Sequence, residues 1–207
     1  MDMFFVISGF VLTLVLQREW ARTGGLELAR FYGRRFKRLI PALALVLATT
    51  VLLAPLLLSP LGPHETVGKT ALGAILLAAN VVIARTSGDY FDDPAESNAL
   101  LHTWSLSVEE QFYLALILVG ATMLALASGR IRRQLMISSA VALGILSLAL
   151  SWWWTGGGGS VLDDPQRFAF FSPAARAFEF LIGVLLAVVI RSVRPPRRTP
   201  AFAVSIL

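Results

Sequence analysis

The chain has 207 residues, of which 56% are hydrophobic and 15% are charged, and its mean hydropathy is +0.71. Because soluble domains have about 25% charged residues, this composition excludes a water-soluble globular protein. The net charge of +5 does not indicate nucleic-acid binding, since the basic residues lie between apolar segments, where they set the orientation of a membrane protein.

Apolar runs along the chain predict membrane-spanning helices, which need about 20 mainly apolar residues each. They are residues 3–16, 39–58, 106–127, 135–154 and 175–190, and a sixth run begins near Ala201 and stops at Leu207. We therefore predict an all-α fold, a polytopic transmembrane helix bundle of about six spans or partial spans. Residues 1–207 form a single domain, which the short first run and the interrupted last run predict to be incomplete at both ends.

Positive charges predict the orientation of this bundle, because the cytoplasmic connections of membrane proteins are enriched in Lys and Arg. Fourteen of the 18 basic residues fall in three connections: Arg18, Arg22, Arg30, Arg34, Arg35, Lys37 and Arg38; Arg130, Arg132 and Arg133; and Arg191, Arg194, Arg197 and Arg198. We predict that these connections face the cytoplasm. The outer side then holds the acidic connections, with Asp89, Asp92, Asp93, Glu96, Asp163 and Asp164.

Residues 70–84 are apolar but too few to cross the membrane, and Asn80 lies near their end. A full crossing here would also place the acidic connections inside and the Arg130 connection outside. We therefore predict a re-entrant segment or half-helix, whose irregular end must be buried by protein. A tilted or broken span is the alternative.

A basic cluster, FYGRRFKRLIP, occupies residues 31–41. On a helix Arg35 and Arg38 share a face, so their guanidinium groups can clamp a pyrophosphate or a nucleotide phosphate. A cytoplasmic position suits a donor such as a coenzyme A thioester. The alternative is that the cluster only sets orientation or contacts lipid headgroups.

A polar stretch, HTWSLSVEEQFY, enters the membrane at residues 102–113. Such a cluster can bind a sugar hydroxyl or orient a catalytic base; its candidate residues are Ser105, Glu109, Glu110 and Tyr113. Glu109 can instead tie helices together through a buried partner, for which Arg176 is the candidate. His102 lies in an outer connection with no orienting partner, so we interpret it as a solvated or interfacial residue rather than a general base.

The remaining ionisable groups at membrane depth are Asp2, at the start of the first run, and the pair Arg176 and Glu179. Arg176 and Glu179 are three residues apart, so a structural ion pair between them is the default interpretation. The chain has no cysteine, which excludes a thiolate metal site and a covalent protein thioester. We expect no metal and no bound cofactor.

Four stretches in order along the chain resemble motifs of the acyltransferase 3 family of membrane proteins, which includes O-antigen and peptidoglycan O-acetylases. They are DMFFVISGF at residues 2–10, the basic cluster, the polar stretch, and RAFEFLIG at residues 176–183. The resemblance implies a bundle of about ten helices in the bacterial inner membrane. It also implies transfer of an acyl group, usually acetyl, from cytoplasmic acyl-coenzyme A to a hydroxyl of a cell-envelope carbohydrate.

The same resemblance implies roles for individual residues. Arg35 and Arg38 match the arginines linked to donor handling, and Asp2 and Glu109 match acidic motif residues and are our catalytic candidates. Ser105, Glu110, Tyr113, Arg176 and Glu179 are the candidates for substrate binding. The family's proposed catalytic histidine lies on a helix before the FFVISGF motif, so we expect this chain to be a fragment without that base.

Two other classes of function remain open from the sequence. A transporter or flippase for a lipid-linked sugar or an acyl carrier would share the broken segment and the intramembrane acids. A binding or scaffold protein without catalysis would also fit.

Overall fold

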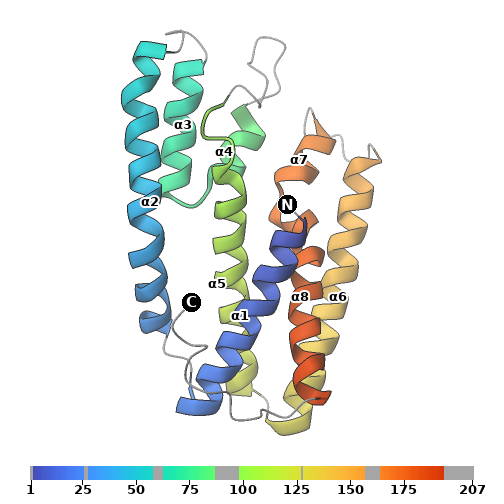
Figure 1. Ribbon diagram of the computed structural model, residues 1–207. Helices are drawn as coiled ribbons and strands as arrows, with labels where there is room; N and C mark the ends of the chain where they lie inside the picture. The colour runs from blue at the N-terminus through green and yellow to red at the C-terminus, as the bar shows by residue number, and fades with distance from the viewer. Residues whose placement is uncertain are drawn as a thin grey trace.

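The computed structural model describes residues 2–25, 28–57, 63–86, 98–126, 128–156 and 164–193. This part of the chain is helical, with no strand (Figure 1). Its helices are α1 (Asp2–Thr23), α2 (Leu28–Leu57), α3 (Pro63–Ile75), α4 (Ala79–Thr86), α5 (Thr103–Leu126), α6 (Gly129–Thr155), α7 (Pro165–Phe171) and α8 (Pro173–Val193).

Within the described residues, five helical segments are long and apolar enough to cross a membrane: α1, α2, α5, α6, and α7 together with α8. A helix of 22 residues is about 33 Å long, which exceeds a hydrocarbon core of about 30 Å. These segments match the first five apolar runs, of which residues 58 and 127 lie outside the described residues, so the predicted multi-pass all-α bundle is confirmed. The sixth run, near Ala201, lies outside the described residues.

Helix α1 packs along α8, and α6 packs on α8 from another side (Figure 1). The contact between α1 and α8 is so close that a Cβ added at Gly183 would lie 2.0 Å from the Val6 carbonyl oxygen. A Cβ at Gly9 would likewise lie 2.2 Å from the Phe180 carbonyl oxygen. Small residues allow membrane helices to approach in this way, and van der Waals contact then stabilises the pair.

The core of the bundle is aromatic. Phe5 of α1 is fully buried and contacts the rings of Trp104 and Phe112 on α5, and Phe112 stacks on Phe180 of α8. Large apolar side chains are exposed on the outer faces of α2 and α6, including Leu56 at 79% and Trp152 at 81%. Such faces are suited to contact with the membrane, because the hydrocarbon chains of lipids are as apolar as these side chains.

The predicted break in residues 70–84 is present. Helix α3 ends at Ile75, α4 begins at Ala79, and Leu77 between them has a φ of 55°. Figure 1 shows α3 descending from the upper end of the bundle and α4 turning back toward that end. With 13 and 8 residues, these helices are about 20 and 12 Å long, so neither is long enough to cross the membrane.

Side chains of α5 satisfy the polar backbone groups at this break, as the prediction of a buried irregular end requires. Gln111 Nε2 donates to the Leu77 carbonyl oxygen at 2.9 Å and to Asn80 Oδ1 at 3.0 Å. The Ala79 N–H donates to Ser107 Oγ at 3.2 Å. Asn80 Nδ2 donates to the carbonyl oxygen of Phe171, at the junction of α7 and α8, at 3.2 Å. Ser107 and Gln111 therefore hold a broken helix in place.

Replacing Gln111 by alanine should destabilise the protein by about 1–3 kcal/mol, because the Leu77 carbonyl and the Asn80 side chain each lose a partner. Unfolding with SDS in dodecyl maltoside micelles measures this free energy. The matched control is Thr122→Val, which removes an exposed hydroxyl that bonds its own helix. If both variants unfold at the same SDS fraction as the wild type, the hydrogen bonds of Gln111 do not stabilise the break between α3 and α4.

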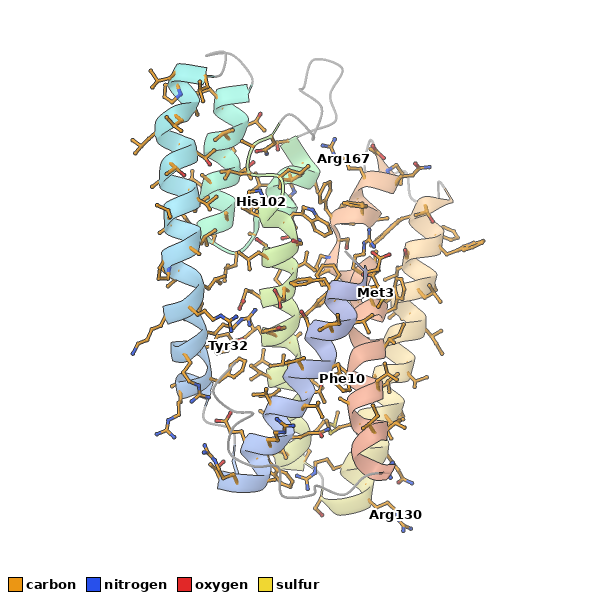
Figure 2. The ribbon with its side chains drawn as sticks, in the orientation of Figure 1. Met3, Phe10, Tyr32, His102, Arg130 and Arg167 are labelled. Carbon is orange, nitrogen blue, oxygen red and sulfur yellow. The ribbon has the colours of Figure 1, made fainter. Side chains whose placement is uncertain are left out.

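The basic segments meet at one end of the bundle. The end of α1, the start of α2, the junction of α5 and α6, and the end of α8 all lie at the lower end of Figure 1. His102 and Arg167 lie toward the opposite end, and Arg130 lies at the lower one (Figure 2). Arg194, Arg197, Arg198, Asp163 and the acidic residues from Asp89 to Glu96 are outside the described residues.

One boundary prediction was wrong. The basic cluster is not a connection: α2 begins at Leu28, so Arg34, Arg35 and Arg38 lie within the helix. The arginine side chains allow this, since long basic side chains can lie along a helix near the membrane surface while their charges remain hydrated. Because α2 is already helical at Leu28, the face that carries Arg35 and Arg38 is directed toward α1 and α5.

Candidate functional site

A buried ion cluster joins α2 to α5. Arg35 Nε donates to Glu110 Oε1, and Arg35 Nη2 lies 3.3 Å from Glu109 Oε1. Both glutamate side chains are buried, at 8% and 3% exposed, whereas that of Arg35 is 25% exposed. Buried charges are costly unless they are paired and hydrogen-bonded. One arginine therefore compensates two neighbouring carboxylates.

Glu109 is held by three helices. Its Oε1 atom accepts from Ser8 Oγ of α1 at 2.9 Å and from the Tyr113 hydroxyl at 2.6 Å, in addition to its contact with Arg35. The Arg35 guanidinium carbon lies 3.9 Å from the centre of the Tyr113 ring, a cation–π contact. These contacts fix Glu109 at the point where α1, α2 and α5 meet.

A cavity of about 490 Å³ opens beside this cluster, between α1, α2 and α5. Its charged lining consists of Arg18, Glu19, Arg22, Arg34, Arg35 and Arg38. Apolar residues such as Val15 and Phe31 form the rest of the wall, together with Tyr113. Arg35 is already paired with Glu109 and Glu110, so the other four arginines, against Glu19, give the lining its positive charge, which suits an anionic ligand.

A second ion cluster ties the start of α1 to α8. Arg176 Nη1 lies 3.0 Å from Asp2 Oδ1 and 2.7 Å from Glu179 Oε1. Arg176 also lies over the Phe170 ring, with its guanidinium carbon 4.7 Å from the ring centre. The predicted pair of Arg176 and Glu179 is confirmed, and Asp2, with its side chain 71% exposed, is the open member of the cluster.

The structure corrects one predicted pairing and separates one residue from the cluster. The buried partner of Glu109 is Arg35, not Arg176, because α2 and not α8 presents its arginine to that face of α5. Ser105 Oγ bonds the carbonyl oxygen of His102 in its own turn at 3.1 Å, apart from the glutamates. His102 is exposed, in agreement with the interpretation of it as a solvated residue.

Sequence reasoning missed Ser8 and the cavity arginines Arg18, Arg22 and Arg34. Ser8 gives no signal by itself, since serines in membrane helices usually bond their own helix, as Thr13 does here to the Gly9 carbonyl. Among the described residues, no group of three or more His, Cys, Asp or Glu side chains could hold a metal ion. The arginine-lined cavity suits anion binding, and the two ion clusters pair charges between helices.

Comparison with known proteins identifies the family. The sequence model of the Acyl_transf_3 acyltransferase domain matches residues 1–207. The chain belongs to the acyltransferase 3 family. The family expected from the four motifs is thus confirmed, and the two ion clusters, which use residues of all four motifs, lie within its acyltransferase domain.

Relatives of this acyltransferase 3 family chain include proteins of known name. It is 30% identical over 192 residues to the peptidoglycan O-acetyltransferase OatA of Listeria monocytogenes, and 34% identical over 193 residues to the O-acetyltransferase OatA of Staphylococcus aureus. Each alignment covers 91% of this chain and 29% of the relative, so the chain spans under a third of the OatA length. An uncharacterized protein of Haemophilus influenzae is 35% identical over 188 residues, which are 91% of this chain and 74% of that protein. No solved structure matches the chain significantly.

Proposed function

We propose that this chain is the membrane part of an O-acyltransferase, which moves an acetyl group from acetyl-coenzyme A to a hydroxyl of a cell-envelope carbohydrate. The observation that carries the proposal is the arginine-lined cavity, which borders a buried ion cluster of Arg35, Glu109 and Glu110 within membrane-spanning helices. Membership of the acyltransferase 3 family and the similarity to OatA proteins support the same activity.

The cavity suits the phosphates of coenzyme A. Guanidinium groups bind phosphate through paired, charge-assisted hydrogen bonds, and several arginines are needed for several phosphates. We assign the phosphates to Arg38 together with Arg34, Arg18 and Arg22. Arg35 differs from these, because both glutamates already engage it. It therefore orients the site more than it clamps a phosphate, which revises the expected clamp of Arg35 and Arg38.

The proposed reaction is attack of a sugar hydroxyl on the carbonyl carbon of the thioester. The C–S bond breaks, coenzyme A leaves as the thiolate, and the hydroxyl proton goes to a base and then to the thiolate. The bundle walls exclude water, which would otherwise hydrolyse the thioester. Glu109 holds Arg35 and Tyr113 in place. On the acceptor side, Arg176 pairs with Glu179 and positions the exposed carboxylate of Asp2.

The proposed orientation follows from the charges. The described basic segments lie at one end of the bundle, and we assign this end to the cytoplasmic face of the bacterial inner membrane. The cavity lies between the halves of α1 and α2 nearest this end. The donor would then enter from the cytoplasm, where acyl-coenzyme A is made, and the acceptor from the opposite side.

Arg38→Ala should weaken coenzyme A binding by roughly 10- to 100-fold, since a charge-assisted hydrogen bond contributes about 1.5–3 kcal/mol. Equilibrium binding of radiolabelled acetyl-coenzyme A to the detergent-purified chain measures this directly. Arg130→Ala is the control, because Arg130 lies at the same end but outside the cavity lining. Unchanged affinity in both Arg38→Ala and Arg34→Ala would rule out the cavity as the donor site.

A transporter remains the second candidate, and one observation favours it. Two helix interruptions, at Leu77 and at Ser172 between α7 and α8, are linked through Asn80, and transporters also place broken helices around a central site. An assay in proteoliposomes that contain the protein and an acceptor oligosaccharide distinguishes the two functions. Transfer of label from acetyl-coenzyme A to the sugar supports the enzyme, whereas movement of the labelled compound without transfer supports the transporter.

A further inference from the structure

The arginine-lined cavity has one acidic residue in its lining, Glu19 of α1, which is only 8% exposed. Its backbone carbonyl oxygen accepts from Thr23 Oγ1 at 2.9 Å, but no group of the described residues forms a hydrogen bond or an ion pair with its carboxylate. Arg22 lies on the same face of α1, three residues further on, and does not pair with it. A buried charge without a partner costs free energy. A ligand that fills the cavity must therefore supply a partner for Glu19.

The chemistry of a carboxylate defines that partner. An ionised carboxylate only accepts hydrogen bonds, and it repels a phosphate, which carries the same sign of charge. A plain polyphosphate would satisfy the arginines and leave Glu19 unpaired. A nucleoside phosphate satisfies both, because its phosphates meet the arginines while a hydroxyl or amine of the nucleoside donates to the carboxylate.

The order of residues along α1 places Glu19 at the outer part of the cavity. The lining residues of α1 extend from Val11 to Arg22, over about 16 Å of helix. The inner members, Val11, Leu12 and Val15, are apolar, whereas the outer members, Arg18, Glu19 and Arg22, are charged. Glu19 lies four residues before the end of α1 at Thr23, at the end of the bundle where the basic segments meet. A donor that enters from this end with its thioester leading leaves its nucleoside beside the charged members and its arm along the apolar ones.

We propose that Glu19 is a specificity-determining residue of the donor cavity, whose carboxylate accepts a hydrogen bond from a hydroxyl or amine of the donor's nucleoside. This inference rests on the proposed function. The four arginines outside the ion cluster attract any polyanion, and Glu19 makes the cavity prefer an anion that carries a nucleoside. It thereby distinguishes acyl-coenzyme A from inorganic polyphosphates and from phospholipid headgroups without such a donor.

Glu19→Gln tests this role, because glutamine keeps the size of the side chain and removes its charge. Binding to the detergent-purified chain is measured at pH 8, where phosphate monoesters are ionised, for adenosine 3′,5′-bisphosphate, coenzyme A and propane-1,3-diyl bisphosphate. The propane compound separates its phosphates by three carbons, as the adenosine compound does, but has neither sugar nor base. Loss of a negative charge strengthens binding of all three, so the measured quantity is the affinity of each nucleotide relative to the propane compound. This ratio should fall roughly 5- to 10-fold for both nucleotides, since a charge-assisted hydrogen bond is about twice as strong as a neutral one.

Glu65→Gln is the matched control. Glu65 of α3 is 67% exposed, pairs with Lys69 and is not part of the cavity lining, so this variant should leave all three affinities unchanged.

The outcomes separate the role of Glu19 from the donor cavity as a whole. An unchanged ratio in Glu19→Gln refutes the role, because Glu19 would then act only on the net charge of a cavity that still binds anions. A fall for coenzyme A alone also refutes it, since the carboxylate would then meet the pantetheine arm and not the nucleoside. If the wild-type chain binds none of the three compounds, the proposed donor cavity itself fails, and the role of Glu19 fails with it.

Discussion

Arg35→Ala is expected to destabilise the protein by about 3–5 kcal/mol, the usual effect of removing one partner from a buried ion pair. The substitution would leave Glu109 and Glu110 as neighbouring buried carboxylates, with no opposite charge from α2. It would also remove the cation–π contact with Tyr113. Unfolding by SDS in dodecyl maltoside micelles measures the loss. Arg34→Ala is the control, since Arg34 lines the same cavity but forms no part of the ion cluster.

A second comparison shows whether charge causes this loss. Adding Glu109→Gln and Glu110→Gln to Arg35→Ala removes the two uncompensated charges, and glutamine can still accept from Ser8 and Tyr113. The triple variant should therefore regain a large part of the lost stability. If it is no more stable than Arg35→Ala, packing of the arginine side chain and not charge compensation holds α2 on the bundle.

Gly183→Ala is expected to destabilise the contact between α1 and α8 by up to about 3 kcal/mol, the upper part of the range for overpacking. The added Cβ would lie 2.0 Å from the Val6 carbonyl oxygen and 2.7 Å from the Phe10 backbone nitrogen. Backbone atoms cannot move aside like the end of a flexible side chain, so the helices must separate. Because Asp2 and Ser8 reach their clusters from α1, donor binding and activity should fall as well.

Gly144→Ala is the matched control for this effect. It makes the same substitution in the membrane-spanning helix α6, where an added Cβ meets nothing within 4 Å. Alanine is the better helix former by up to about 1 kcal/mol, so this variant should be as stable as the wild type or more so. If Gly183→Ala behaved in the same way in the micelle unfolding assay, the close contact would not control stability.

The broad architecture could be predicted from the sequence because the causes are local. A long apolar run must become a helix in lipid, since its backbone groups have no other partners. The five complete runs therefore predicted the five helical segments long enough to span the membrane, and the short run at residues 70–84 predicted the break between α3 and α4. The start of α2 was missed because charge alone does not distinguish a basic connection from a basic helical turn.

The residues of the candidate site were largely recognised, but their partners were not. Arg35, Glu109, Glu110 and Tyr113 all belong to one cluster, and Asp2, Arg176 and Glu179 belong to the other. Spacing along one helix reveals only neighbours within that helix, such as Arg176 and Glu179. It does not reveal that Glu109 meets Arg35, 74 residues earlier, or that Ser8 contributes from α1.

The sequence by itself determined that this chain has several helices able to cross a membrane, that its described basic segments lie at one end of the bundle, and that it carries the motifs of its family. Hydrophobicity and charge act on each segment separately, so they can be read one segment at a time. Only the tertiary structure decided which helices are neighbours, because that depends on glycine contacts such as Gly9 with Phe180 and on buried ion pairs between distant residues. The arginine-lined cavity arises from that packing, since α1 and α2 each supply part of its charge.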